Sequence, residues 1–228
     1  MKVNLTIVRN QRKLSSLFRG ILSDNPVLVG GMALPFLIVP AVTLQNSVAL
    51  LCAMLIVHLP TIAVLYLLRK ALPQRLRSLA VPVVASLFLM VALFAIQSLF
   101  PYILETWGIY FLLLPMCSML FASCNHLMEE RKPTLGRTLL RSLCDVVGFG
   151  VVACILGAVR ELFGAGTLWG KPVGIQGISS LQMAFAGFLM LGFLAVGARM
   201  LHRLVLRLSA GVSKRLLKEV AREASSND

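Results

Sequence analysis

The stretch at residues 156–170, LGAVRELFGAGTLWG, places a charged pair, Arg160 and Glu161, at the end of an apolar run. Ionised side chains are expensive in hydrocarbon, so such a pair is expected inside a helix bundle, along a cavity or at the headgroup boundary. The glycines that follow, beginning with Gly164 and Gly166, are typical of a helix end and a tight turn. The stretch therefore predicts the end of a membrane helix whose two charged side chains need partners.

Composition shows that the rest of the chain belongs in a membrane. Of 228 residues, 58% are hydrophobic and 14% are charged, and the mean hydropathy is +0.86. Ordinary soluble domains are about 45–50% apolar and about 25% charged. The net charge of +13 would by itself suit either nucleic acid or anionic lipid as a partner. The distribution of the basic residues over the loops favours lipid.

Six apolar segments predict an all-α, multi-pass membrane protein. They cover residues 25–45, 46–68, 78–100, 108–127, 143–163 and 179–200. The membrane domain is thus expected over residues 25–203, with a basic tail at 204–228. Residues 1–24 carry basic and apolar residues in alternation, which predicts an amphipathic cytoplasmic lead on the bilayer surface. A disordered tail is the alternative for that lead.

The basic residues sort by side of the membrane. With six spans, 20 of the 22 lysines and arginines fall in the two termini and the second and fourth loops, and the opposite side holds Arg160 and Lys171. Cytoplasmic loops carry such an excess of Lys and Arg. The pattern predicts that both termini lie in the cytoplasm.

Prolines interrupt the first and fourth segments. Pro35 and Pro40 lie in the first and Pro115 lies in the fourth. A three-plus-three arrangement makes these two segments enter from opposite faces, and matched interruptions in two halves are typical of an inverted repeat with a site near the bilayer midplane. The sequence therefore predicts six transmembrane helices in an inverted 3+3 repeat, with broken first and fourth helices.

Several polar residues lie inside the apolar segments. His58 is expected to hydrogen-bond a neighbouring helix, with a proton relay as the alternative. Asp145 lies near the start of the fifth segment, and the pair Arg160 and Glu161 lies near its end. For these three charged residues, either a structural role at a helix end or a place along an ion path is consistent with the pattern.

The five cysteines all lie within or at the edges of spans, and no CxxC motif occurs. Isolated buried cysteines usually act as small hydrophobic residues. Cys117 and Cys124 are seven residues apart and share a helix face, but about 10.5 Å of helical rise separates them. That pair alone is therefore not expected to supply adjacent ligands to one iron.

The motifs resemble the Rnf/Nqr family, the paired six-helix subunits of ion-translocating, ferredoxin- or NADH-driven respiratory complexes. Residues 156–170 resemble the family motif LGSxREIxGxGTLFG, and NPVLVGGMALP at 25–35 resembles NxxLVxxLGLCP. Asp145, in SLCDVVGFG, stands where the family has an ALDG element. The likeness covers about residues 25–203 and is greater to the E/D-type member than to its A/E-type partner.

The resemblance implies a 2Fe-2S cluster shared across an interface with a homologous membrane subunit, each broken helix providing one cysteine. This sequence departs from that pattern, because Leu34 stands where the first cysteine is expected. The family spacing of 21 residues back from Asp145 places the second at Cys124, although its surroundings, SCNHLMEE, differ from the motif. Leucine cannot ligate iron, so this polypeptide alone is expected to hold no two-iron cluster.

The resemblance further implies membership of a translocase or oxidoreductase complex in the bacterial inner membrane, coupling electron transfer to Na⁺ or H⁺ translocation. No catalytic residue is assigned, and the chain is expected to act with other complex subunits and membrane lipid, without nucleic acid. The alternative is a divergent transporter or permease-type component that kept the fold and lost the redox role. A purely structural assembly subunit is a third hypothesis.

Overall fold

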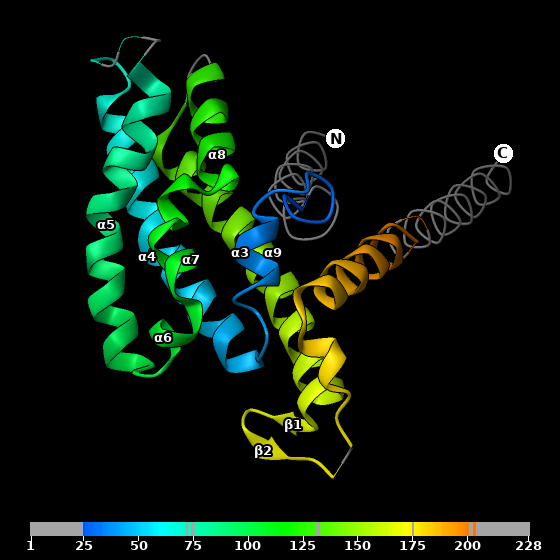
Figure 1. Cartoon of the computed structure of the whole chain (residues 1–228). Coiled ribbons are helices and arrows are strands. Elements are labelled where there is room, and N and C mark those ends of the chain that lie inside the picture. The colour runs from blue at the N-terminus through cyan, green and yellow to red at the C-terminus, as the bar shows by residue number, and fades with distance from the viewer. Residues whose placement is uncertain are drawn as a thin grey trace, which may run out of the picture.

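A computed structural model gives the protein's structure for residues 25–71, 73, 76–130, 133–174, 176–200 and 203. The predicted lead (1–24) and tail (204–228) lie outside these residues. The described chain is built mainly from helices (Figure 1).

Three helices are long and apolar enough to cross a bilayer. They are α4 (Leu44–Leu68), α5 (Arg77–Leu99) and α9 (Leu135–Arg160), which a π-helical turn, η3 (Glu161–Ala165), extends to 31 residues. About 20 apolar residues suffice to span the hydrocarbon core. These helices correspond to the second, third and fifth predicted segments. However, α9 begins eight residues before the predicted start at 143, so its first turns, with Arg137 and Arg141, extend into the predicted loop.

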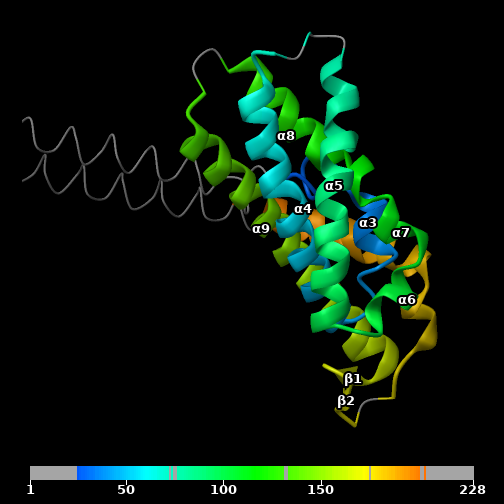
Figure 2. The ribbon, with the colours of Figure 1, turned by 90° about the vertical axis from the view of Figure 1, so that its left-hand side faces the viewer.

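Helix α4 occupies the middle of the bundle, with α9 on one side and α5 on the other (Figures 1 and 2). Glycines make the α4–α9 approach close: a Cβ atom on Gly157 would overlap Ser47 Oγ and lie 2.6 Å from Thr43 O. Small residues at helix contacts let backbones approach closely in membranes. The α4–α9 pair is therefore the framework on which the remaining segments pack.

The first and fourth segments are built from short pieces rather than continuous spans. The first contains α3 (Leu34–Ile38), and the fourth contains α7 (Ile109–Leu112), η2 (Leu114–Met116) and α8 (Ser118–Glu129). Pro35 and Pro115 occupy the first turns of α3 and η2. A backbone N–H at this position would have no partner within the helix, so proline, which has no N–H, loses no hydrogen bond there. These prolines thus begin short helices, and directly before α3 the backbone takes positive φ values, 60° at Gly31 and 59° at Ala33.

The region after α9 corrects the all-α prediction in one detail. Strands β1 (Thr167–Leu168) and β2 (Lys171–Pro172) form a small antiparallel hairpin. The 3-10 turn η4 (Ser179–Gln182) then precedes the helix Ala184–Met200, so the last helix begins later than the predicted residue 179. This helix is shorter than the three candidate spans, and it leaves the bundle obliquely (Figure 1, yellow to orange).

The bundle has two distinct ends (Figures 1 and 2). The C-terminus of α4, the N-terminus of α5 and the α8–α9 connection lie at one end, together with Arg69, Lys70 and Arg77. The opposite end carries the short helix α6 (Ile103–Trp107) and the β1–β2 hairpin. The loops predicted to be basic therefore share one end of the molecule.

Candidate functional site

Arg160 lies at the last turn of α9 and is 1% exposed. Its guanidinium donates to the carbonyl of Ile38, the last residue of α3, at 2.6 Å and to Ala41 O, in the turn that follows, at 3.1 Å. It also donates to the carbonyls of Leu181, Gln182 and Met183 around η4. The carbonyls at a helix C-terminus have no partner within the helix and carry the negative end of its dipole. Arg160 supplies both the donors and the positive charge that this position needs.

Glu161 follows in the first turn of η3 and is equally buried, at 1% exposed. One carboxylate oxygen accepts from Leu44 N at 2.8 Å, the first N–H of α4. The other accepts from Gly170 N at 2.8 Å and from Thr167 Oγ1 at 3.3 Å, both in the hairpin. A carboxylate is favoured at a helix N-terminus by the dipole and the free N–H groups. Glu161 thus joins α4, α9 and the hairpin.

The two charges act on one connection and not on each other. Within the described ranges the single ion pair joins Arg137 and Glu130, both partly exposed. Arg160 caps the end of α3, Glu161 caps the start of α4, and the residues between them form the loop that closes the first interrupted segment. The pair therefore fixes that loop against the end of α9. Arg160 and Glu161 are equally buried, at 1% exposed each.

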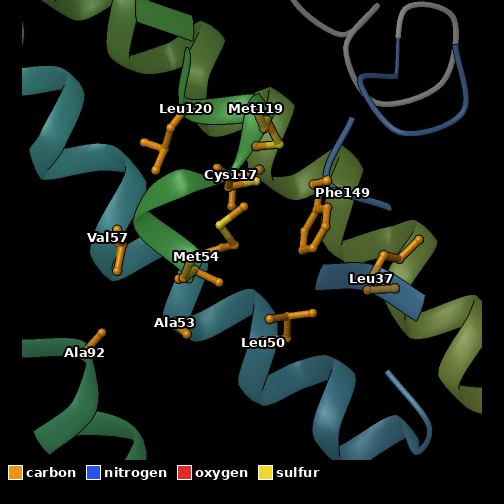
Figure 3. Packing of buried hydrophobic residues seen from close by; sticks show 14 of the residues in the cluster. Leu37, Leu50, Ala53, Met54, Val57, Ala92, Cys117, Met119, Leu120 and Phe149 are labelled. Carbon is orange, nitrogen blue, oxygen red and sulfur yellow. The ribbon is translucent and has the colours of Figure 1, made fainter. Parts of the chain in front are cut away.

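The breaks in the two interrupted segments meet each other. Ala33 N, directly before α3, donates to Ser118 Oγ at 2.9 Å, at the start of α8. The neighbouring Cys117 is fully buried in the apolar cluster that includes Met54, Leu120 and Phe149 (Figure 3). Leu34 packs against the same cluster. The structure thus brings together the two positions at which the chain departs from a regular helix.

The candidate ligand Cys124 lies away from this meeting point, within α8 and 2% exposed. The residue at the break itself is Cys117. Among the residues that the structure describes, no three His, Cys, Asp or Glu side chains gather to hold a metal. A 2Fe-2S cluster takes four thiolates. At the two breaks this chain offers one thiol, that of Cys117, and the first break has Leu34 instead of a cysteine. The described residues do not fit such a cluster by themselves.

Asp145, in the N-terminal half of α9, lines a cleft of about 270 Å³ between that helix, the start of the first segment and α8. The polar residues that line this cleft are Asn25, Ser123, His126, Arg141 and Asp145 itself. Asn25 Nδ2 donates to Gly148 O at 2.9 Å, which attaches the start of the first segment to α9. Asp145 is half-buried and does not meet the Arg160–Glu161 element, which lies about four turns further along α9.

Sequence reasoning missed two serines that connect the helices. Ser118 accepts at the break, and Ser123 Oγ lies 3.1 Å from His58 Nε2, linking α8 to α4. His58 is fully buried, so the predicted hydrogen bond to a neighbouring helix is present. Both serines lie in the apolar run SMLFAS, and serine within such a run is a recognised interhelical contact residue. That signal could have identified them.

Comparison with known proteins gives a family match over most of the chain. The sequence profile of the family described as "Rnf-Nqr subunit, membrane protein" matches residues 13–199. The D subunit of the Na⁺-translocating NADH-quinone reductase of Chlamydia pneumoniae is 25% identical over 79% of this chain and 90% of its own length.

Two further relatives belong to ferredoxin-type or related ion-translocating complexes. The E subunit of the Na⁺-translocating ferredoxin:NAD⁺ oxidoreductase complex of Acetobacterium woodii is 29% identical, over 69% of this chain and 79% of the relative. The E subunit of the ion-translocating oxidoreductase complex of Shewanella piezotolerans is 27% identical, over 70% and 72%. Because the family profile covers far more than half of the chain and the membrane helices fall within it, the protein is a member of the Rnf-Nqr family of membrane subunits.

Proposed function

We propose that this chain is a membrane subunit of an Rnf-like or Nqr-like complex that couples electron transfer to Na⁺ or H⁺ translocation. The observation that carries the proposal is the family match over residues 13–199, together with relatives that are all subunits of ion-translocating oxidoreductases. The chain contributes structure and an ion route within the complex and is not a catalytic chain by itself.

Affinity purification of the tagged chain from gently solubilised membranes tests this proposal. We expect flavin- and iron-sulfur-containing subunits to co-purify with it, since all three relatives are named as parts of oxidoreductase assemblies. Recovery of the tagged chain in well-folded form without any redox subunit would contradict the proposal.

The six-span inverted repeat is part of the same proposal. Two structural relations support it: the interrupted segments meet through Ala33 and Ser118, and each central helix holds the connection that follows the opposite interrupted segment. Arg160 of α9 binds the α3–α4 connection, and Tyr66 Oη of α4 donates to Pro133 O, 3.2 Å away in the α8–α9 connection. Equivalent contacts at opposite ends are what a repeat of inverted topology requires.

The proposed orientation in the bacterial inner membrane places both termini and the basic loops in the cytoplasm. Single cysteines at Lys70 and Arg137 are expected to react with a membrane-impermeant maleimide in inside-out vesicles and to be protected in intact spheroplasts. Labelling of either position from the periplasmic side would contradict the orientation.

A homologous membrane subunit is the proposed neighbour. The helix Ala184–Met200 exposes apolar side chains over much of its surface, including Phe185, Phe188 and Phe193. An apolar groove of about 520 Å³ runs between this helix and α9. Packing of a second six-helix protein of the family on this side would bury both features.

For the cofactor, we propose that this chain alone holds no two-iron cluster. At the first break Leu34 stands where the resemblance implies a cysteine, and Cys124 lies within α8 rather than at the second break. Cys124→Ser is expected to leave the iron and sulfide content and the EPR spectrum of the purified complex unchanged, because Cys124 serves as a buried apolar residue in α8. Loss of a membrane-cluster signal on this single change would show that Cys124 is a ligand.

Asp145 is the proposed ion-path residue, whereas Arg160 and Glu161 have a structural role. Asp145 lies in a polar cleft, and both charges of the pair are already occupied by backbone partners. Asp145→Asn is therefore the change expected to lower ion uptake per electron transferred while the thermal stability is retained.

Glu161→Gln tests the structural role. We expect a loss of about 1.5–3 kcal/mol in the free energy of unfolding, since a hydrogen-bonded carboxylate is replaced by an amide whose NH₂ group would face N–H donors. Ion uptake per electron transferred by the folded complex should be unchanged. Glu105→Gln, at an exposed glutamate of α6, is the matched control and should change neither quantity. An uptake defect in Glu161→Gln without a fall in melting temperature would assign Glu161 to the ion path instead.

The second candidate is a transporter or permease-type component without a redox role. The observation that favours it is Leu34 at the first break, which removes a cysteine that the family resemblance implies. It differs from the first candidate in one measurable respect, because its transport would not depend on an electron donor.

A further inference from the structure

The β1–β2 hairpin carries an unusual residue at its turn. Leu168 pairs with Lys171, so Trp169 and Gly170 form a two-residue loop, and their φ values are 55° and 72°. Two positive φ values are the requirement of a type I′ turn, in which Asn-Gly is strongly preferred at the two central positions. A bulky residue in the left-handed region is a genuine outlier. The turn therefore accommodates a tryptophan where the backbone favours asparagine.

The surroundings of this tryptophan are apolar and nearly uncharged. Trp169 is 47% exposed, and Phe163, Leu168, Val173 and Ile178 nearby are exposed to a similar or greater degree. Between residues 162 and 182 the one charged residue is Lys171. Indole rings, aliphatic side chains and an extended lysine are the groups that occupy the headgroup boundary of a bilayer.

The position of the hairpin along the membrane normal fits that boundary. The helix that ends at Ala165 has 31 residues, about 46 Å at 1.5 Å per residue, which exceeds the roughly 30 Å hydrocarbon core. The hairpin begins two residues later, at the end of the bundle away from the basic loops (Figure 2). Glu161 holds Thr167 and Gly170 against the helix end, so the tip is presented at a fixed depth.

We propose that the tip Leu168–Trp169 inserts into the headgroup interface of the leaflet opposite the basic loops and fixes the depth of the α9 end in the bilayer. This inference rests on the spanning arrangement proposed above. Membrane contact would account for a tryptophan at position 169, where the backbone conformation itself favours asparagine.

The chain offers a clean spectroscopic test, because it has two tryptophans. Trp107 is buried beside Phe111 and its Nε1 has no hydrogen-bond partner among the described residues, so Trp107→Phe leaves Trp169 as the single reporter without loss of a hydrogen bond. In proteoliposomes of this variant we expect the emission of Trp169 to be blue-shifted. A lipid spin label near the headgroup should quench it more strongly than a spin label at the end of the acyl chain, and more strongly than acrylamide in the aqueous phase. Efficient acrylamide quenching without lipid-depth dependence would overturn the proposal.

A second variant separates membrane contact from a merely structural role. Trp169→Asn gives the turn its preferred Asn-Gly sequence, so the hairpin should fold at least as well. In a Lys171→Cys background, we expect this change to increase the rate of labelling by a membrane-impermeant maleimide, because the tip is released into water. An unchanged rate would count against the proposal.

Docking of the tip on a neighbouring protein of the complex is the competing outcome. A benzophenone amino acid placed at position 169 in native membranes should crosslink to lipid and leave the protein band unshifted. A shifted band containing a second polypeptide would overturn the membrane proposal. If the tip proves to lie in water while donor-driven ion uptake remains dependent on the chain, this inference alone fails and the proposed function stands.

Discussion

Arg160→Met should lower the free energy of unfolding by about 3–5 kcal/mol, because several buried carbonyls lose their donor at about 1–3 kcal/mol each. The substitution keeps much of the side-chain volume, but it leaves the carbonyls of Ile38 and Ala41 without donors in a region where water does not reach them. In thermal unfolding of the detergent-solubilised protein, the melting temperature should fall by about 10 °C or more.

Arg137→Met is the matched control on the same helix. Arg137 forms an exposed ion pair with Glu130 at 3.8 Å, and such surface pairs contribute about 0–1 kcal/mol. A melting temperature for Arg160→Met that equals that of the control would contradict the structural role of Arg160.

Gly157→Leu should be the second large effect, at about 3 kcal/mol, the upper part of the usual range for overpacking. The contact that a side chain would meet includes backbone, Thr43 O, as well as Ser47 Oγ, and backbone cannot rotate away. Helices α4 and α9 must separate, which also moves Leu44 N away from Glu161. Thermal unfolding measures the loss, and the yield of folded protein after size-exclusion chromatography should fall with it.

Gly136→Leu provides the comparison, because a Cβ atom at Gly136 meets nothing within 4 Å. Leucine forms helix better than glycine by roughly 0.8 kcal/mol, so this variant should be neutral or slightly stabilised. Equal melting temperatures for the two leucine variants would mean that the α4–α9 approach is not close in the membrane.

Much of the architecture follows from residue patterns. Composition predicts a membrane protein, and apolar length predicts α4, α5 and the C-terminal part of α9, because hydrocarbon demands long apolar helices with all backbone groups paired. The motif at residues 156–170 carries the family resemblance, which the family profile confirms. Burial of Arg160 and Glu161 follows from the cost of exposing charge to lipid.

The partners of those charges could not be predicted from spacing. Arg160 binds carbonyls more than 100 residues away in sequence, and Glu161 accepts from the first N–H of α4. Such contacts depend on how α3 ends and α4 begins, which no periodicity specifies. Pro35 and Pro115 lie in the two interrupted segments, as the sequence predicts, but the sequence pattern does not show that each begins a short helix. Proline both breaks helices and begins them, and each of these two prolines occupies a first helical turn.

Ion uptake into inverted membrane vesicles tests the central claim most directly. Vesicles from a strain lacking this chain, and from the same strain complemented with it, would be energised with NADH or reduced ferredoxin while Na⁺ and H⁺ uptake are followed. We expect donor-driven uptake of one of these ions to be lost without the chain and restored by complementation. Undiminished donor-driven uptake in the deletion strain, or uptake that needs the chain but no electron donor, would contradict it.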